Sequence, residues 1–155
     1  MAVDGDGAFF HCRMKLSGYN AGMQEKNGQP VQILVVDDNQ PFRRLVTAWL
    51  LESGYQVVEA QDGEDALTKL AIHTIDLILL DLQMEPLGGF HFKDAVRGTP
   101  LHNIPTLLIT SDSSSDMLMR AARMGFSAVM KKPIERVRLL RMIEQQLDRR
   151  PATSL

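Results

Sequence analysis

Five polar side chains with complementary chemistry each follow a short apolar run. They are Asp37, Asp38, Asp81, Thr110 and Lys132. Carboxylates that lie within a few ångströms of one another raise each other's pKa and oppose folding, so three of them need neutralising charge. Ligands that offer only oxygen atoms suit Mg²⁺. Three carboxylates, one Mg²⁺ and one ammonium sum to zero, so this set predicts a magnesium site.

A carboxylate beside Mg²⁺ can act as a nucleophile toward a phosphoryl group, which would give an aspartyl phosphate. We expect Asp81 to be the nucleophile because it stands alone, while the adjacent pair Asp37 and Asp38 is better suited to hold metal. The Thr110 hydroxyl could donate to a phosphoryl oxygen. We choose Lys132 over Lys131 as the ammonium because surface lysines usually point to solvent.

Ordinary structural roles compete with these interpretations. An aspartate readily caps a following helix, which would account for Asp37 and Asp38 taken alone. A threonine also suits a strand end simply because it is β-branched. Coincidence explains the whole set poorly, since Asp81, Thr110 and Lys132 each lie at a predicted strand end.

The elements that would position these side chains alternate along the chain. Apolar runs predict strands at residues 31–36, 56–60, 75–80, 104–109 and 127–130. Helical periodicity predicts a helix capped by Asn39 and ended by Gly54, then helices at residues 63–72, 89–97, 115–124 and 134–149. The apolar residues expected to face inward are Phe42, Leu45, Val46, Trp49, Leu50, Ala66, Leu67, Leu70, Ala71, Ile134, Val137, Leu140, Ile143 and Leu147.

Five strands that each precede a helix predict a doubly wound α/β fold, (βα)5, with one parallel sheet covered on both faces. The flavodoxin-like strand order 2-1-3-4-5 is the common solution for five strands. In that order, strands 1 and 3 flank the crevice where ligands bind at the carboxyl ends. The fold would therefore bring residues 37 and 132 into one crevice.

Length and composition fit a single globular domain. The chain has 155 residues, of which 45% are apolar and 23% charged. Its longest apolar runs have four residues, against the roughly 18 to 20 that span a bilayer. We expect a disordered arm over residues 1–30, one domain over 31–149, and a tail at 150–155 without an output domain. With Asp4 and Asp6 where a secretory signal would be basic, we expect a cytoplasmic protein.

Charge argues against a nucleic-acid partner. Residues 31–130 carry seven basic and thirteen acidic side chains, whereas nucleic-acid binders gather Lys and Arg on one face. Only residues 131–150 are basic, with seven basic against three acidic side chains. Cations near the end of a helix are favoured by its dipole, which is a sufficient explanation for that stretch.

Residues 31–149 resemble the receiver domain of two-component response regulators. The resemblance rests on the pair Asp37–Asp38, Asp81 in the run DLQMEPLGG, Thr110 after LLI, and the pair Lys132–Pro133. It implies phosphorylation of Asp81 by a sensor histidine kinase or histidine phosphotransferase.

The same resemblance implies how the site is built and used. Mg²⁺ would be held by Asp38, Asp81 and the main-chain carbonyl of Gln83, with Asp37 acting largely through water. The peptide bond before Pro133 would be cis. A downstream protein would dock on the face formed by the last two helices and the strand between them, and a homodimer is possible.

Two residues depart from the family pattern. Glu85 stands between Met84 and Pro86, where the family usually has Met–Pro, and it adds negative charge near the site. Val129 occupies the position three before Lys132 that is usually aromatic and coupled to the switch hydroxyl. Any switch would then be read out differently, for example through the polar loop at residues 111–116.

Two other functions compete with this one. A receiver that is never phosphorylated would work as a scaffold, and Val129 and the displaced Pro86 favour that alternative. A phosphatase of the haloacid dehalogenase type also uses an Asp nucleophile with Mg²⁺, but it needs a second Asp two positions on. Gln83 stands there and cannot transfer a proton as a carboxyl group does.

Overall fold

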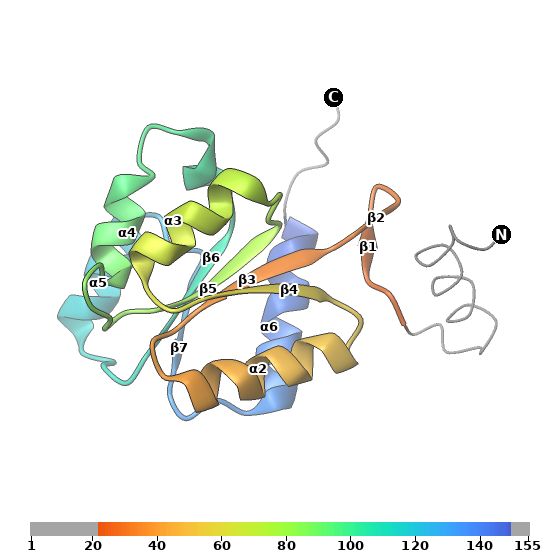
Figure 1. Ribbon diagram of the computed structural model, residues 1–155. Helices are drawn as coiled ribbons and strands as arrows, with labels where there is room; N and C mark the ends of the chain where they lie inside the picture. Colours follow the sequence, from red (N-terminus) through yellow and green to blue (C-terminus); the bar gives the residue numbers. More distant parts are fainter. Residues whose placement is uncertain (1–21, 150–155) are drawn as a thin grey trace, which may run out of the picture.

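The computed structural model describes residues 22–149, which form a helix–sheet–helix sandwich (Figure 1). The central sheet has five parallel strands in the order β4-β3-β5-β6-β7, which is 2-1-3-4-5 in chain order. The strands are β3 (Gln32–Val36), β4 (Gln56–Ala60), β5 (Leu77–Asp81), β6 (Thr106–Thr110) and β7 (Ala128–Lys131). The predicted fold class and strand order are confirmed.

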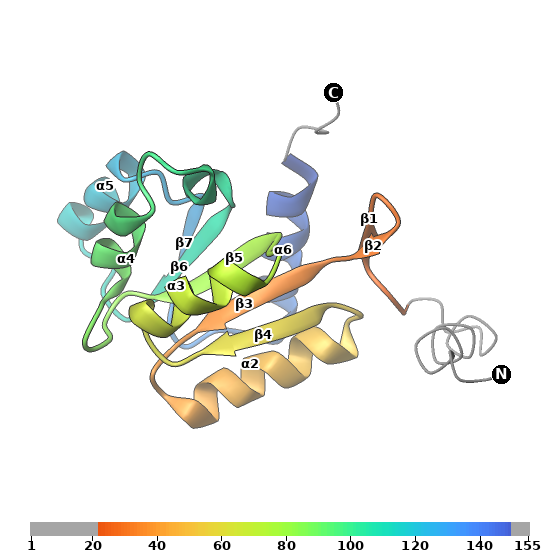
Figure 2. The same ribbon diagram turned by 45° about the horizontal axis from the view of Figure 1, so that its top comes forward.

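Helices cover both faces of the sheet, as a parallel sheet requires. They are α2 (Gln40–Glu52), α3 (Gly63–Ile72), α4 (Gly89–Ala95), α5 (Ser115–Arg123) and α6 (Arg136–Arg149), with a short 3₁₀ helix, η1 (Pro100–Asn103). In Figures 1 and 2, α2 and α6 lie on one face and α3, α4 and α5 on the other. Within the described residues, no helix is long and apolar enough to cross a membrane.

The central strand β5 shows why the core forms two layers. All five of its residues are buried, because both faces of the strand are covered. Side chains alternate along a strand, so Leu77 and Leu79 pack with α2 and α6, while Ile78 and Leu80 pack with α3, α4 and α5. Asp81, the last residue of β5, is thereby held at the edge of a rigid core.

Local signals set the helix ends. The Asn39 side chain accepts a hydrogen bond from the Phe42 amide at 3.0 Å and caps α2, as predicted. The last helix begins at Arg136 rather than at residue 134. The ladder pairs Asp81 with Ile109 and so extends β5 past its predicted end.

Three residues predicted to face inward do not. Leu45 is 48% exposed and Val137 64% exposed, and Ala71 is also exposed. In α6 the fully buried side chains are Leu139 and Ile143, four residues apart, so the buried stripe runs along a different line from the predicted one. Periodicity indicates that a helix has an apolar face. When the apolar stripe is only one or two residues wide, however, the pattern does not determine which side of the helix is buried.

A hairpin precedes the sheet, formed by β1 (Glu25–Lys26) and β2 (Gln29–Pro30). Its two-residue turn, Asn27–Gly28, has positive φ values of 56° and 77°, which suits a tight hairpin. The amide of Gln24 donates to the carbonyl of Gly54 at 2.9 Å and ties the hairpin to the end of α2. Residues 25–30 thus form regular structure within the stretch that was predicted to be a disordered arm. Residues 1–21 and 150–155 of the predicted arm and tail lie outside the described residues.

Candidate functional site

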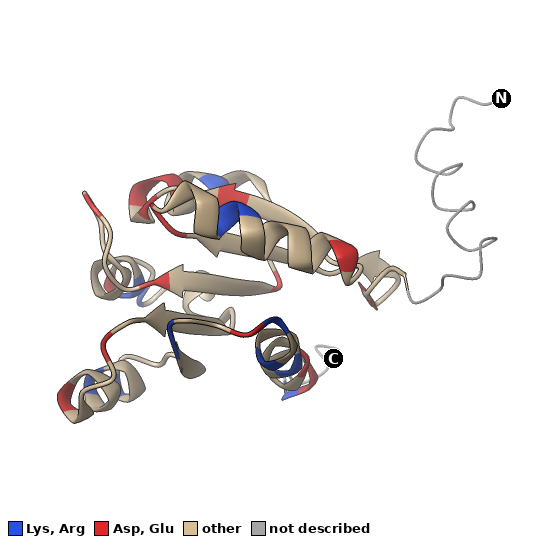
Figure 3. Ribbon diagram, turned by 90° about the horizontal axis from the view of Figure 1, so that it is seen from below, with Lys and Arg blue, Asp and Glu red and all other residues tan. Residues whose placement is uncertain are grey.

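Three carboxylates meet at the carboxyl ends of β3 and β5. Asp37 and Asp38 follow β3, and Asp81 ends β5. Each offers an oxygen that lies within 4.8 Å of the other two, which is the only such group of potential metal ligands among residues 22–149. Asp37 and Asp81 are buried, and Asp38 is exposed. Figure 3 shows acidic segments at the arrowhead ends of the strands.

Lys132 supplies the positive charge next to this group. Its Nζ lies 3.1 Å from Oδ2 of Asp37 and 3.4 Å from Oδ1 of Asp81. Its backbone amide donates to the carbonyl of Thr110 at 2.9 Å, which fixes the loop after β7 beside the end of β6. Lys131 is exposed, so the structure brings the expected lysine of the pair to the site. The peptide bond between Lys132 and Pro133 is cis, as expected.

Asp37 is immobilised from several sides. Its Oδ1 accepts a hydrogen bond from the amide of Asn39 at 2.8 Å, while Oδ2 contacts Lys132. Its main-chain carbonyl accepts from Nη1 of Arg43 at 2.7 Å, and Nε of Arg43 forms an ion pair with Glu59 at 2.8 Å. One Asp37 oxygen on a backbone amide and the other on an ammonium give a carboxylate of fixed orientation.

The pKa of Asp81 is raised to about 6. Burial is the largest cause, and the nearby Asp37 carboxylate adds to it, while Lys132 acts in the opposite direction. Together, burial and the like charge of Asp37 raise the pKa of Asp81 more than the Lys132 ammonium lowers it. Further positive charge among these oxygens would favour the ionised carboxylate, so the donor set fits a hard divalent cation.

Thr110 connects the site to the β6–α5 loop. It is 1% exposed, and its Oγ1 accepts a hydrogen bond from the amide of Asp112 at 3.0 Å. Asp112 in turn accepts from the amide of Ser114 at 2.8 Å, which lowers the pKa of the Asp112 carboxyl. The Ser114 hydroxyl caps α5 by accepting from the Met117 amide at 3.3 Å. A change at the Thr110 hydroxyl would therefore reach the start of α5 through two hydrogen bonds.

The β5–α4 loop closes the site on the side of Gln83 and Glu85. A Cβ at Gly89 would lie 2.8 Å from the carbonyl oxygen of Asp81, so only glycine allows α4 to start this close to β5. The Glu85–Pro86 peptide bond is cis. A hollow of about 620 Å³ opens beside the carboxylates, and its lining includes Asp38, Gln83, Glu85, His91 and Arg120. The side chains of Gln83 and Glu85 are exposed.

Sequence reasoning missed three side chains around the site. The Phe42 ring, expected only to face the core, lies 4.6 Å from Nζ of Lys132 and forms a cation–π contact with it. Arg43 holds the Asp37 carbonyl, and Arg120 stacks over the Phe90 ring at 4.1 Å on the wall of the hollow. Their positions on α2 and α5 gave no separate signal. Val129 is half-buried and packs against the core beneath α3, α4 and α5.

Comparison with known sequences identifies the same residues as one family domain. The family described as "Response regulator receiver domain" matches residues 33–144. A sensor kinase/phosphatase for the CAI-1 autoinducer from Vibrio cholerae, CqsS, is 34% identical over 121 residues, which are 77% of this chain and 18% of that protein. The Regulator of RpoS from Escherichia coli is 34% identical over 110 residues, 71% of this chain and 32% of that protein. The chain thus spans under a third of the length of these two relatives.

Solved structures share the fold over most of their own length. The chemotaxis protein CheY4 of Vibrio cholerae is 30% identical, with a TM-score of 0.71 over 74% of this chain and 97% of that one. A CheY-like receiver domain protein from Methanospirillum hungatei is 24% identical, with a TM-score of 0.70 over 76% of this chain and 94% of that one, and shares the fold.

Proposed function

The chain belongs to the response regulator receiver domain family, and from that membership we propose that Asp81 accepts a phosphoryl group from a phosphorylated histidine. The donor would be a sensor histidine kinase or a histidine phosphotransferase. The proposal is supported most directly by the position of Asp81, which ends the central strand within 3.4 Å of Lys132 and beside two further carboxylates.

The proposed step transfers one phosphoryl group. An oxygen of the Asp81 carboxylate attacks the phosphorus atom, the phosphorus–nitrogen bond to the donor histidine breaks, and the bonding pair stays on the imidazole. Lys132 would hold the phosphoryl oxygens as charge moves onto them, and the Thr110 hydroxyl would donate to one of them. The product is an aspartyl phosphate, so Asp81 must be ionised when it attacks.

The oxygen donors at the site fit Mg²⁺. Asp38 and Asp81, with the main-chain carbonyl of Gln83, are the proposed ligands, and Asp37 would support them from its fixed position between Asn39 and Lys132. When bound, the ion supplies positive charge that offsets the repulsion between carboxylates and phosphoryl oxygens. The raised pKa of Asp81 is the physical reason that such charge would be needed.

We propose that residues 31–149 act as a cytoplasmic signalling unit that binds a target protein through the face of α5, β7 and α6. Three large apolar side chains are exposed on these helices: Leu118 at 41%, Met119 at 56% and Val137 at 64%. The hydrogen bonds from Thr110 to the start of α5 provide a route from the phosphorylated site to this face. Met119→Ser should weaken binding of an identified target while phosphorylation persists; unchanged binding would remove this face from the proposal.

Intact-mass spectrometry tests phosphorylation directly. The chain is incubated with Mg²⁺ and acetyl phosphate, beside the variants Asp81→Asn and Asp94→Asn. Asp94 is an exposed aspartate on α4 and serves as the matched control. We expect one added phosphoryl group in the natural sequence and in Asp94→Asn, and none in Asp81→Asn or without Mg²⁺. No adduct with acetyl phosphate or with a histidine phosphotransferase, together with no binding of Mg²⁺, would favour the phosphorylation-independent scaffold.

A further inference from the structure

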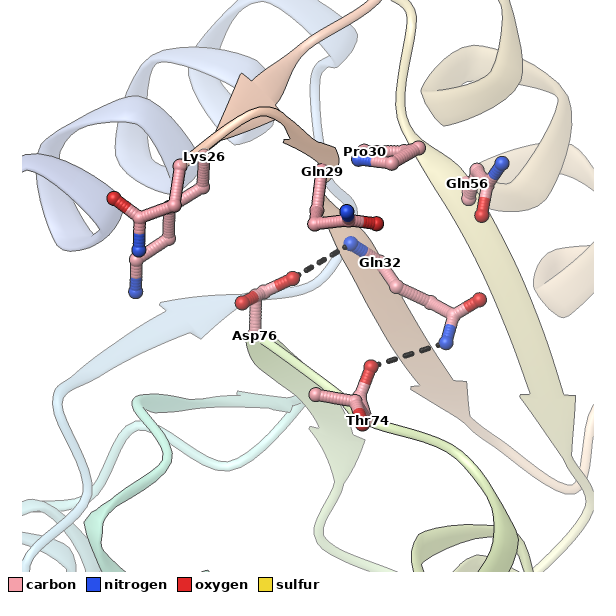
Figure 4. Close-up of a pocket in the computed structure, with 8 residues that line it drawn as sticks. Lys26, Gln29, Pro30, Gln32, Gln56, Thr74 and Asp76 are labelled. Carbon is pink, nitrogen blue, oxygen red and sulfur yellow. Dashed lines mark hydrogen bonds between the residues drawn. The ribbon is translucent and has the colours of Figure 1, made fainter. Parts of the chain in front are cut away.

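The β1–β2 hairpin lines two hollows at the amino ends of the strands, far from Asp81. Figure 4 shows one, where the main chain and side chain of Gln32 donate to Asp76 at 2.9 Å and to the carbonyl of Thr74 at 3.0 Å. The other has a volume of about 350 Å³ and lies between the hairpin and the end of α6. It is lined by Gln24, Glu25, Lys26, Val31, Tyr55, Glu144, Leu147 and Asp148.

This second hollow, here called the acidic hollow, holds three carboxylates and one ammonium. Glu144 and Asp148 are four residues apart on α6, so they share one face of the helix and repel each other. Glu25 adds a third negative charge from β1. Within residues 22–149, none of these three carboxylates forms a salt bridge.

Tyr55 gives the acidic hollow a buried polar wall. The residue is 4% exposed, and in the described part of the chain its hydroxyl has no hydrogen-bond partner. The pKa of Tyr55 is raised to about 12, chiefly by burial and in addition by the negative charges of Glu144 and Asp148. Tyr55 and these two carboxylates line the same hollow. Within residues 22–149, the fully buried side-chain polar atoms without a partner are Thr47 Oγ1 and His102 Nδ1, so the Tyr55 hydroxyl opens into the hollow. There it can accept a hydrogen bond from a ligand.

The spacing of the carboxylates argues for an organic cation rather than a metal ion. Among residues 22–149, only the group at Asp37, Asp38 and Asp81 brings three ligand atoms within 4.8 Å of one another. The carboxylates of the acidic hollow are therefore too far apart to surround one ion. Val31 and Leu147 add apolar surface to the lining, which suits the methylene groups of an aliphatic chain.

We propose that the acidic hollow binds an aliphatic ammonium group, with its nitrogen between Glu144 and Asp148 and its carbon chain against Leu147. A free diamine and the lysine side chain of a protein partner share this chemistry. The proposal is independent of the phosphorylation proposed above, because no residue of the acidic hollow belongs to that site.

Calorimetric titration of the full chain with 1,5-diaminopentane, and separately with a lysine blocked at both ends, tests the proposal and distinguishes the two sources. We expect saturable binding at one site. In the double variant Glu144→Gln, Asp148→Asn the Kd should rise about tenfold or more, because two charge-assisted contacts are lost. Tyr55→Phe should raise the Kd by about threefold or more, because one hydrogen bond from the ammonium is lost.

The matched control is the double variant Glu64→Gln, Glu135→Gln, which removes the same charge from exposed positions outside the acidic hollow. An unchanged Kd in this control supports a specific site. Tighter binding of the blocked lysine would indicate a protein partner, and tighter binding of the diamine would indicate a free polyamine. Equal loss in both double variants, or no saturation with either probe, would overturn the proposal.

Discussion

Two groups of three carboxylates lie at opposite ends of the parallel sheet and differ in spacing and burial. Asp37, Asp38 and Asp81 bring their oxygens within 4.8 Å at the carboxyl ends, and two of them are buried. The carboxylates of the acidic hollow are exposed and surround a volume of about 350 Å³ at the amino ends. The same charge in two geometries suits two kinds of cation: a small hard ion in the first and an extended ammonium in the second.

The two groups also differ in what already neutralises them. Lys132 lies against two carboxylates of the first group and over the Phe42 ring, and its side chain is only 24% exposed. The carboxylates of the acidic hollow have no salt bridge within residues 22–149. Removing a charged side chain should therefore change the free energy of unfolding strongly at the first group and weakly at the second.

The largest expected effect follows loss of the Lys132 ammonium. In Lys132→Met at pH 8 without Mg²⁺, the free energy of unfolding should fall by about 3 kcal/mol, because two buried carboxylates lose their cation. Mg²⁺ should restore part of that loss. Urea unfolding measures both, with Lys131→Met as the exposed neighbouring control. Equal losses in the two variants would show that the carboxylates do not depend on Lys132.

The next effect concerns Asp81 and has the opposite sign. Its pKa is raised to about 6 in the folded protein from 3.8, so the folded state binds the proton more tightly and stability falls as pH rises through this range. Asp81→Asn removes the penalty and should stabilise the Mg²⁺-free protein by about 1–2 kcal/mol at pH 8. The gain should fade between pH 6 and pH 4. Urea unfolding at several pH values, with Asp94→Asn as control, checks this; a gain that grows on acidification would contradict it.

A second buried lysine provides a contrast with Lys132. Lys93 is 2% exposed, and its Nζ donates to the carbonyl of His102 at 3.1 Å and lies 5.7 Å from the Phe126 ring. Burial lowers its pKa, and no carboxylate pairs with it among residues 22–149. Lys93→Met should change the free energy of unfolding by less than about 1 kcal/mol, since methionine fills similar volume without a charge to desolvate. If Lys93→Met lowered the free energy of unfolding as much as Lys132→Met does, burial of a lysine rather than its carboxylate partners would determine the loss of stability.

The fold and the positions of the site residues could be predicted because topology alone determines them. Alternating strand and helix patterns imply a parallel sheet, and the ends of its strands must converge. Asp81 and Lys132 could therefore be placed together from sequence. The side of a helix that a residue occupies depends on where the helix begins and how it packs, so Leu45 and Val137 were wrongly placed and Phe42 beneath Lys132 was missed.

The acidic hollow could not be predicted in the same way. Its residues come from positions 24–31, 55 and 144–148, and no strand-end rule brings these together. The turn signal Asn27–Gly28 was available in the sequence and marks the hairpin. The docking of that hairpin on the end of α2 rests on two hydrogen bonds from Gln24, to the carbonyls of Gly54 and Ser53, which no sequence pattern indicates.

The smallest effect tests whether the acidic hollow is one electrostatic unit. In a Tyr19→Phe background Tyr55 is the only tyrosine, so tyrosinate absorbance during alkaline titration reports it alone. The pKa of Tyr55 should fall from about 12 in Glu144→Gln, Asp148→Asn and stay above 10.0, because burial, the largest cause, remains while both repelling charges are gone. Circular dichroism at each pH confirms that the chain is folded. The Glu64→Gln, Glu135→Gln control should leave the pKa of Tyr55 unchanged. An unchanged Tyr55 pKa in the first variant would mean that these carboxylates do not face the hydroxyl, and the contrast between the two ends of the sheet would then reduce to burial alone.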